Sequence, residues 1–265
     1  MKLRFLTILA ALLAFASLDA AAQPMRPSRP GRLHAGTDAF HGIGLTFGYV
    51  NSSYRTLDLA TDEASPSGLL HGFTLGLTKD FTLLPHALYF QTGLNYIYQN
   101  DPRNENYRIP LTDMSVRIVG DREEHHLGIP IRLKYDLHLL DRVGLTFDAG
   151  PTLLMGLSSK YQYKTKLNDN VASVDYNLYN GKVNASGVSS DFDLEDWMEK
   201  SGMYPYGRLG RFDVMLGASV GAHFFHVLEV RIGYDWGLLN RYRKEVADMY
   251  SMHRGQFTLS AGIRF

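Results

Sequence analysis

Serine and histidine side chains occur near the ends of several segments of this chain, and the two residue types together can carry out acyl transfer. Ser158 or Ser159 could act as a nucleophile, with one of three histidines as its general base: His71, His125 or His126. Such a pair would attack a lipid ester or a peptide bond. The simpler interpretation is that these histidines lie at a wet interface. We therefore expect no enzyme and no catalytic residues, and a rim hydrolase remains the alternative.

Metal and cofactor chemistry find little support in the residue types. His125 and His126 are adjacent, and neighbouring residues on a strand point to opposite faces, so they do not form a metal pair. The 265 residues include no cysteine, which excludes disulfides, thiolate metal sites and a cysteine nucleophile. The 27 basic and 27 acidic residues balance, which argues against nucleic-acid binding. We expect no metal and no cofactor.

Ion pairing is the chemistry that a second group of residues suggests. Nine charged side chains recur at two-residue spacing within otherwise apolar segments, so they share the polar face of extended strands. Four are basic and five are acidic, which allows them to pair. They are Arg132, Lys134, Asp136, Asp148, Asp213, Glu229, Arg231, Asp235 and Arg264.

The elements that would position these charges are eight segments in which apolar and polar residues alternate, the pattern of β-strands. Each has about the 9–11 residues that a tilted strand needs to cross a bilayer. They are 43–50, 69–81, 88–98, 127–137, 143–157, 212–224, 228–238 and 256–265. The connections 82–87, 138–142 and 225–227 are short, whereas 51–68, 99–126, 158–211 and 239–255 are long. This alternation is typical of outer-membrane barrels.

The composition of the two strand faces indicates which face points inward. One face carries nearly all the leucine, isoleucine, valine and phenylalanine, and the other carries glycine and the nine charges. Glycine and charge cannot build a core in water, whereas a membrane barrel holds polar residues in its lumen. We therefore predict an all-β, eight-stranded, antiparallel, up-and-down transmembrane barrel. Its long loops would be extracellular, its short turns periplasmic, and its lumen filled by the paired charges.

The N-terminal residues predict export. Lys2 and Arg4 precede an apolar run of about 14 residues, and Ala20-Ala21-Ala22 follows, as in a secretory signal peptide. We expect residues 1–22 to be cleaved and 23–40 to form a basic, proline-rich periplasmic linker, with the barrel at 41–265. The expected location is the outer membrane of a Gram-negative cell, with outer-membrane lipids as neighbours.

Several strands also resemble the PorT-like outer-membrane β-barrel family of Bacteroidota, often called a porin family. Residues 126–135, H-L-G-I-P-I-R-L-K-Y, are similar to that family's Y-L-E-I-P-L-L-L-K-Y strand, from which Gly128 and Arg132 depart. A-G-P-T-L at 149–153 and R-F-D at 211–213 also resemble family segments. The terminal Phe265 resembles the signal that such barrels present to the barrel-assembly machinery. One branch of the family takes part in type IX secretion.

The connection 158–211 is the largest candidate for an interaction site, since connections of this length are usually functional or disordered. Within it, 191–202 reads as a short helix with acidic residues in its first turn. Phe192, Trp197 and Met198 could anchor a partner, such as another envelope or secretion-system protein, or could fold over the barrel mouth. The sequence thus favours a structural or accessory role, with a small-solute or ion channel as the alternative.

Overall fold

The computed structural model describes residues 42–84, 88–108, 115–140, 142–167, 170–187, 209–225 and 227–264. The predicted signal peptide 1–22 and linker 23–40 lie outside these ranges, so they stay predictions. The same is true of the anchor residues Phe192, Trp197 and Met198, and of the terminal Phe265.

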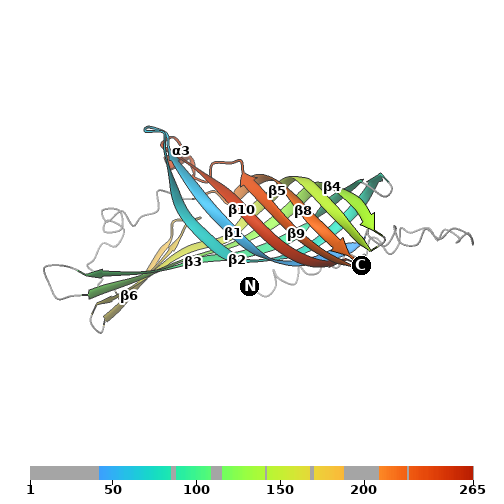
Figure 1. Ribbon diagram of the computed structural model, residues 1–265. Helices are drawn as coiled ribbons and strands as arrows, with labels where there is room; N and C mark the ends of the chain where they lie inside the picture. Colours follow the sequence, from blue (N-terminus) through green and yellow to red (C-terminus); the bar gives the residue numbers. More distant parts are fainter. Residues whose placement is uncertain are drawn as a thin grey trace, which may run out of the picture. The chain divides into compact units, whose positions relative to one another are not determined.

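The predicted eight-stranded antiparallel barrel is confirmed (Figure 1). The strands follow the order β4-β3-β2-β1-β10-β9-β8-β5, and β4 pairs with β5 to close the sheet. Closure removes the edges that an open sheet would leave unpaired. The barrel strands are β1 (Ile43–Asp58), β2 (Glu63–Leu84), β3 (Leu88–Arg108), β4 (Ser115–Leu140), β5 (Val143–Leu167), β8 (Phe212–Phe224), β9 (Leu228–Gly237) and β10 (Tyr250–Arg264).

Several strands continue well beyond their predicted ends. The expected loop 51–68 is mostly strand, because β1 and β2 pair up to Asp58 and Glu63. The expected loop 158–211 contains the end of β5 and two further strands, β6 (Asn170–Asn177) and β7 (Val183–Ser186). These extensions carry few apolar side chains, so alternation of hydrophobicity could not reveal them. In Figure 1, β6 lies at the opposite end of the barrel from the C-terminus; we call that end the mouth and the other the turn end.

Burial follows strand parity as the face assignment requires. Outward apolar side chains are exposed, for example Phe47 at 60% and Phe212 at 67%. Inward polar side chains are buried, for example Lys134 at 0% and Asp213 at 2%. Apolar residues therefore cover the outside of the barrel, and charged residues lie within it.

The described residues include a single short helix, α3 (Lys244–Ala247), between β9 and β10. None of the helical segments described is long and apolar enough to cross a membrane.

Candidate functional site

The turn end of the lumen holds a network of ion pairs around Asp80. Lys134 Nζ lies 3.2 Å from Asp80 Oδ2, Arg264 pairs with the same carboxylate, and Gln91 donates to Oδ1 over 2.6 Å. The sequence analysis missed Asp80, although its spacing from Thr78 places it on the polar face of β2. We call these residues, with their partners Asp136 and Glu229, the turn-end network.

Glu229 links the turn-end network across the barrel. Arg264 Nε donates to its Oε2 over 2.6 Å, and Arg231 Nη2 donates to Oε1 over 2.8 Å. Lys134 lies 3.8 Å from Glu229 and 3.5 Å from Asp136. Lys134, Arg231 and Arg264 therefore each lie within 4 Å of at least one carboxylate, so the charges of this network are paired.

A second group of pairs lies deeper in the lumen. Arg132 contacts Asp235 and lies 3.9 Å from Asp148, and Arg231 Nη1 lies 3.3 Å from Asp148. Beside them is a chamber of about 100 Å³. Its wall is polar and rich in hydroxyls, which suits ordered water. The wall includes Thr46, Thr74, Thr78, Thr152, Thr258, Ser219, Ser260 and Asn95.

An apolar layer of four inward side chains also lies in the lumen: Val50, Ile97, Leu154 and Met215. They come from β1, β3, β5 and β8, and none is more than 3% exposed. The sequence analysis missed this layer because it assigned the polar face from glycine and charge. Strand parity alone would have placed these four residues inside.

At the mouth, Glu124 is the centre of a fully buried polar cluster. Arg122 donates to Glu124 Oε1 through Nε (3.0 Å) and Nη2 (2.7 Å), and Ser159 donates to the same oxygen over 3.1 Å. The Tyr54 hydroxyl donates to Oε2 over 2.5 Å. Tyr54 lies beyond the outward apolar band. Burial is the main cause that raises the pKa of Tyr54. The hydroxyl therefore keeps its proton and acts as the donor.

Arg254 joins the mouth cluster through neutral acceptors. Its Nε donates to Ser52 over 3.1 Å, Nη2 donates to Gln256 over 2.9 Å and to Gln99, and Nη1 lies 3.0 Å from His126 Nε2. Since an arginine can only donate, the histidine nitrogen must accept, which requires a neutral ring. We call Tyr54, Arg122, Glu124, His126, Ser159 and Arg254, with the nearby Arg241, the mouth cluster.

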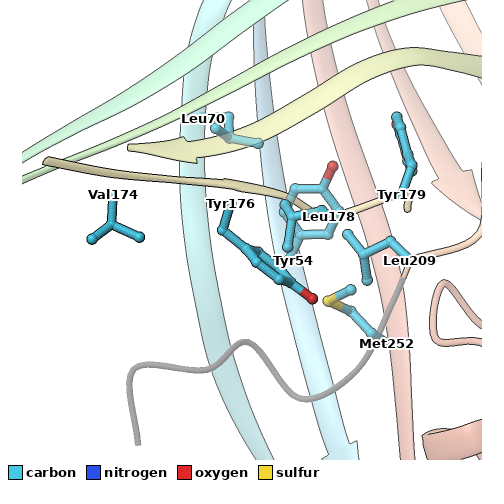
Figure 2. Close-up of a cluster of buried hydrophobic side chains, with 8 residues drawn as sticks. All are labelled: Tyr54, Leu70, Val174, Tyr176, Leu178, Tyr179, Leu209 and Met252. Atoms are coloured by element: carbon cyan, nitrogen blue, oxygen red, sulfur yellow. The ribbon is translucent and has the colours of Figure 1, made fainter. Parts of the chain in front are cut away.

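An apolar cap adjoins the mouth cluster and shares Tyr54 with it; Figure 2 shows the buried side chains of the cap. Leu178 and Tyr179, which follow β6, and Leu209 pack against Tyr54 of β1 and against residues of β2 and β10. Backbone bonds hold the cap in place: Leu178 N donates to Ser159 O (3.0 Å), and Leu209 N donates to Leu178 O (2.8 Å). Part of the expected long loop therefore folds over the barrel mouth.

Among the described residues no hydrogen bond joins a serine to a histidine of the proposed rim hydrolase, although His125 and Ser158 are register partners on β4 and β5. His71 faces outward and contacts the Tyr49 hydroxyl (2.5 Å), whereas His125 contacts Tyr96 (2.6 Å) and Glu123 (2.8 Å). His126 and Ser159 lie inside the barrel on opposite oxygens of Glu124: Ser159 donates to Oε1 over 3.1 Å, and His126 Nε2 lies 3.6 Å from Oε2.

Ser219 lies within a G-x-S-x-G run at 217–221 that was overlooked when the chain was searched for a nucleophile motif. A nucleophile elbow needs a strand, a sharp turn and a helix. This run lies inside β8, and the Ser219 hydroxyl donates to Asp148 in the lumen. The match is therefore a strand that happens to fit the motif.

The remaining predicted lumen residue, Asp213, lies at the mouth rather than in the turn-end network. Its Oδ1 accepts from Leu239 N over 3.3 Å, and its other oxygen has no hydrogen-bond partner among the described residues.

The residues that the structure describes contain no group of three or more histidine, aspartate or glutamate side chains that could hold a metal ion.

Comparison with solved structures gives membrane barrels of low similarity. The attachment invasion locus protein Ail of Yersinia pestis, solved with the heparin analogue sucrose octasulfate, is 12% identical, over 85% of this chain and 99% of that chain, with a TM-score of 0.35. Neisserial surface protein A is 11% identical, over 83% and 97%, with a TM-score of 0.33. A comparison with curated proteins gave no match.

A family model gives the assignment. The model described as "Outer membrane protein beta-barrel domain" matches residues 22–242, which is well over half of the chain and includes seven of the eight barrel strands. The chain therefore belongs to this family and is an integral β-barrel protein of a Gram-negative outer membrane.

Proposed function

We propose that the protein has a structural or accessory role in the outer membrane and that side chains fill its lumen so that solutes do not pass. The observation that carries this proposal is the succession of barriers in the lumen. The turn-end network, the apolar layer and the cap each bring side chains from several strands into contact.

The physical cost of opening these barriers supports the proposal. An apolar constriction excludes water and ions, because neither finds a hydrogen-bond partner there. Separating one partner from a buried ion pair costs about 3–5 kcal/mol, and the turn-end network contains several such pairs. A solute would have to disrupt both, as well as displace the cap.

The chamber supports a second candidate, a small-solute or ion channel. A polar cavity of about 100 Å³ beside Arg132 and Asp148 is a place where a small ion could rest. Passage would still need the apolar layer to open. A rim hydrolase has no comparable support, since His125 contacts Tyr96, Ser159 donates to Glu124, and no hydrogen bond joins a proposed serine to a proposed histidine among the described residues. We therefore propose that the protein has no enzymatic activity.

The accessory role that we propose acts through the extracellular part. β6 and β7 extend the sheet beyond the barrel, and the segment 188–208 with Phe192, Trp197 and Met198 is the proposed anchor for another envelope or secretion-system protein. Phe265 is the proposed signal to the barrel-assembly machinery. A place in the PorT-like family of Bacteroidota, and in type IX secretion, belongs to this proposal.

Liposome swelling tests the sealed lumen. Vesicles loaded with an impermeant sugar and reconstituted with the folded protein should swell in isotonic glycine no faster than protein-free vesicles. A general porin in matched vesicles serves as the positive control. Swelling that increases with the amount of protein would favour the channel.

Cells that carry a shortened protein test the accessory role. A chromosomal variant without residues 188–208 keeps every described strand, so it should still assemble in the outer membrane. We expect it to lose the crosslinked partner that the full chain captures, and to reduce export of surface proteins as a complete deletion does. If the shortened protein still captures the partner and supports normal export, while the complete deletion reduces export, the segment is not the anchor.

A further inference from the structure

Arg241, between β9 and α3, is an unpaired cation inside the barrel mouth. Its side chain is fully buried, at 0% exposure. Its backbone is well held, since Arg241 N donates to Met252 O (2.9 Å) and its carbonyl accepts from Gly210 N (2.7 Å). Its Nε, Nη1 and Nη2 have no hydrogen-bond partner among the described residues, and the Tyr179 hydroxyl is near without accepting in good geometry.

Such a group is costly to bury. A guanidinium cannot release its proton in a protein, so it cannot become neutral. A buried donor without a partner costs about 1–3 kcal/mol, and an uncompensated buried charge costs several kcal/mol more. A native structure therefore needs a partner for Arg241, from the protein, from water or from a bound ion.

The mouth cluster has more positive than negative charge. Its cations are Arg122, Arg241 and Arg254, and the acids that act on Arg241 are Glu124 and Asp213. His126 adds no charge, because its ring accepts from Arg254. Among the residues that the structure describes, two acids against three arginines leave one positive charge uncompensated, even if Asp213 is assigned entirely to Arg241.

Most of the protein's own acceptors at this place are already used. Arg122, Ser159 and Tyr54 occupy both oxygens of Glu124. Arg254 lies 3.9 Å from Glu124 and is otherwise satisfied by neutral side chains. Asp213, which also acts on Arg241, keeps one oxygen without a hydrogen-bond partner among the described residues, but that oxygen is not within hydrogen-bond distance of Arg241 and is a single acceptor for three donor nitrogens.

We propose that the mouth cluster binds one small oxyanion, such as phosphate or sulfate, at Arg241 beside Tyr179 of the cap. A guanidinium presents donors in a planar fork that matches two oxygens of such an anion, which a spherical ion such as chloride cannot match. The anion balances the remaining positive charge, and Arg254 adds a second cation nearby. The site is independent of the proposed accessory role.

The burial of the site identifies the source of the anion. Arg241 is fully buried, and its carbonyl accepts from Gly210 N, next to Leu209 of the cap, so the phosphate of a membrane lipid, which lies outside the barrel, does not reach it. The anion must come free from solution, and it enters when the Tyr179 side chain moves aside. We expect capture during folding and slow exchange afterwards.

Thermal unfolding in detergent micelles tests the site. The full chain is refolded without oxyanions, and the melting temperature is measured by circular dichroism while phosphate or sulfate is raised to 10 mM at constant ionic strength. We expect a saturating rise of about 3–6 °C at tenfold excess over Kd. Millimolar concentrations keep the general stabilising effect of these salts small. Chloride over the same range should have no such effect.

Two variants locate the effect. Arg241→Met keeps the bulk of the side chain without charge, so it should fold and lose the dependence on oxyanions. Arg211→Gln removes an exposed arginine near the cap and should keep it. A dependence that persists in Arg241→Met would overturn the proposed site.

A second measurement does not depend on any variant. The full chain refolded in radiolabelled phosphate should retain about one phosphate per chain after desalting. If no label is retained and the melting temperature does not respond, water between Arg241 and Asp213 is the partner, and the proposal is wrong.

Discussion

Lys134 shows how a single residue stabilises the turn-end network. Its ammonium group lies within 4 Å of Asp80, Asp136 and Glu229 and is fully buried. Lys134→Met would leave these acids with fewer cations in a site of low dielectric constant. We expect unfolding in micelles to become easier by about 3–5 kcal/mol, measured by denaturant titration.

Lys160→Met is the matched control for Lys134→Met, because Lys160 is an exposed lysine of the neighbouring strand β5. Surface charges contribute about 0–1 kcal/mol, so this variant should unfold close to the unmodified protein. Equal losses in the two variants would contradict the role given to the buried network.

Asp121, beyond the outward apolar band of β4, provides a pH-dependent test. Burial, then the charges of Glu123 and Asp101, raise the pKa of Asp121 above its ordinary value. An acid with a raised pKa favours the folded state when protonated, so its contribution becomes unfavourable as pH rises through that raised pKa. Asp121→Asn should therefore raise the melting temperature at pH 7 by about 1–2 °C.

The gain from Asp121→Asn should disappear near pH 3, where the carboxyl of the unmodified protein is protonated in both the folded and the unfolded state. The melting temperatures of Asp121→Asn and of the unmodified protein, measured at pH 7 and near pH 3, test this expectation. A gain that is equal at both would show that Asp121 acts through packing.

The sequence predicted which residues lie inside the barrel wherever the hydrophobic alternation of their strand is regular. Arg132, Lys134 and Glu229 lie within strong alternation, and their places inside the barrel follow from it. Arg122 and Arg241 lie in segments without alternation that were read as loops. No local pattern shows that such residues turn inward, because their burial depends on contacts with distant strands.

At the scale of elements, hydrophobic alternation predicted the lipid-facing parts of the strands rather than their full length. Beyond the outward apolar band apolar residues are few and no longer alternate regularly, so the period disappears although the backbone pairing continues, as between Asp58 and Glu63. β6 and β7 lie in this region for the same reason. β6 depends on pairing with β5, and β7 depends on pairing with β6; neither pairing is encoded in the local sequence.

Gly156 tests how the cap is seated on the barrel. A Cβ at this position would collide with the Tyr179 hydroxyl, whose ring is packed in the cap. Gly156→Ala should therefore push the cap outward, lower the melting temperature and speed tryptic cleavage after Lys182. Gel analysis of a digestion time course measures the cleavage.

Gly210→Ala is the control for Gly156→Ala, because the nearest atom to its added Cβ would be at 3.6 Å, an ordinary contact. It should be cleaved at the rate of the unmodified protein. If Gly156→Ala is equally resistant, the cap does not depend on that close contact.

At the scale of the whole molecule, the acidic and basic residues of the chain are equal in number, but those inside the barrel are unevenly distributed along its length. The turn-end network and the chamber together hold four bases and five acids, namely Arg132, Lys134, Arg231 and Arg264 with Asp80, Asp136, Asp148, Glu229 and Asp235. The mouth cluster with Asp213 has the opposite excess. The lumen therefore has no single sign of charge along its length that would attract one kind of ion throughout.

The outward apolar surface determines how the isolated protein must behave. Side chains such as Phe47 and Leu216, both more than half exposed, would face water if lipid or detergent were removed. We expect the purified chain to aggregate when detergent is diluted out and to stay monodisperse in micelles, as size-exclusion chromatography would show. A folded, monodisperse protein in plain buffer would contradict the face assignment.

Single-channel recording in planar bilayers tests the central claim, the filled lumen, most directly. The folded protein, with insertion verified by accessibility of the mouth to protease, should give no steady current at ±100 mV in 1 M KCl. A general porin inserted under the same conditions provides the reference conductance. A large, steady current that scales with the number of inserted molecules would show that the ion pairs and the apolar layer leave an open path, and the account would be wrong.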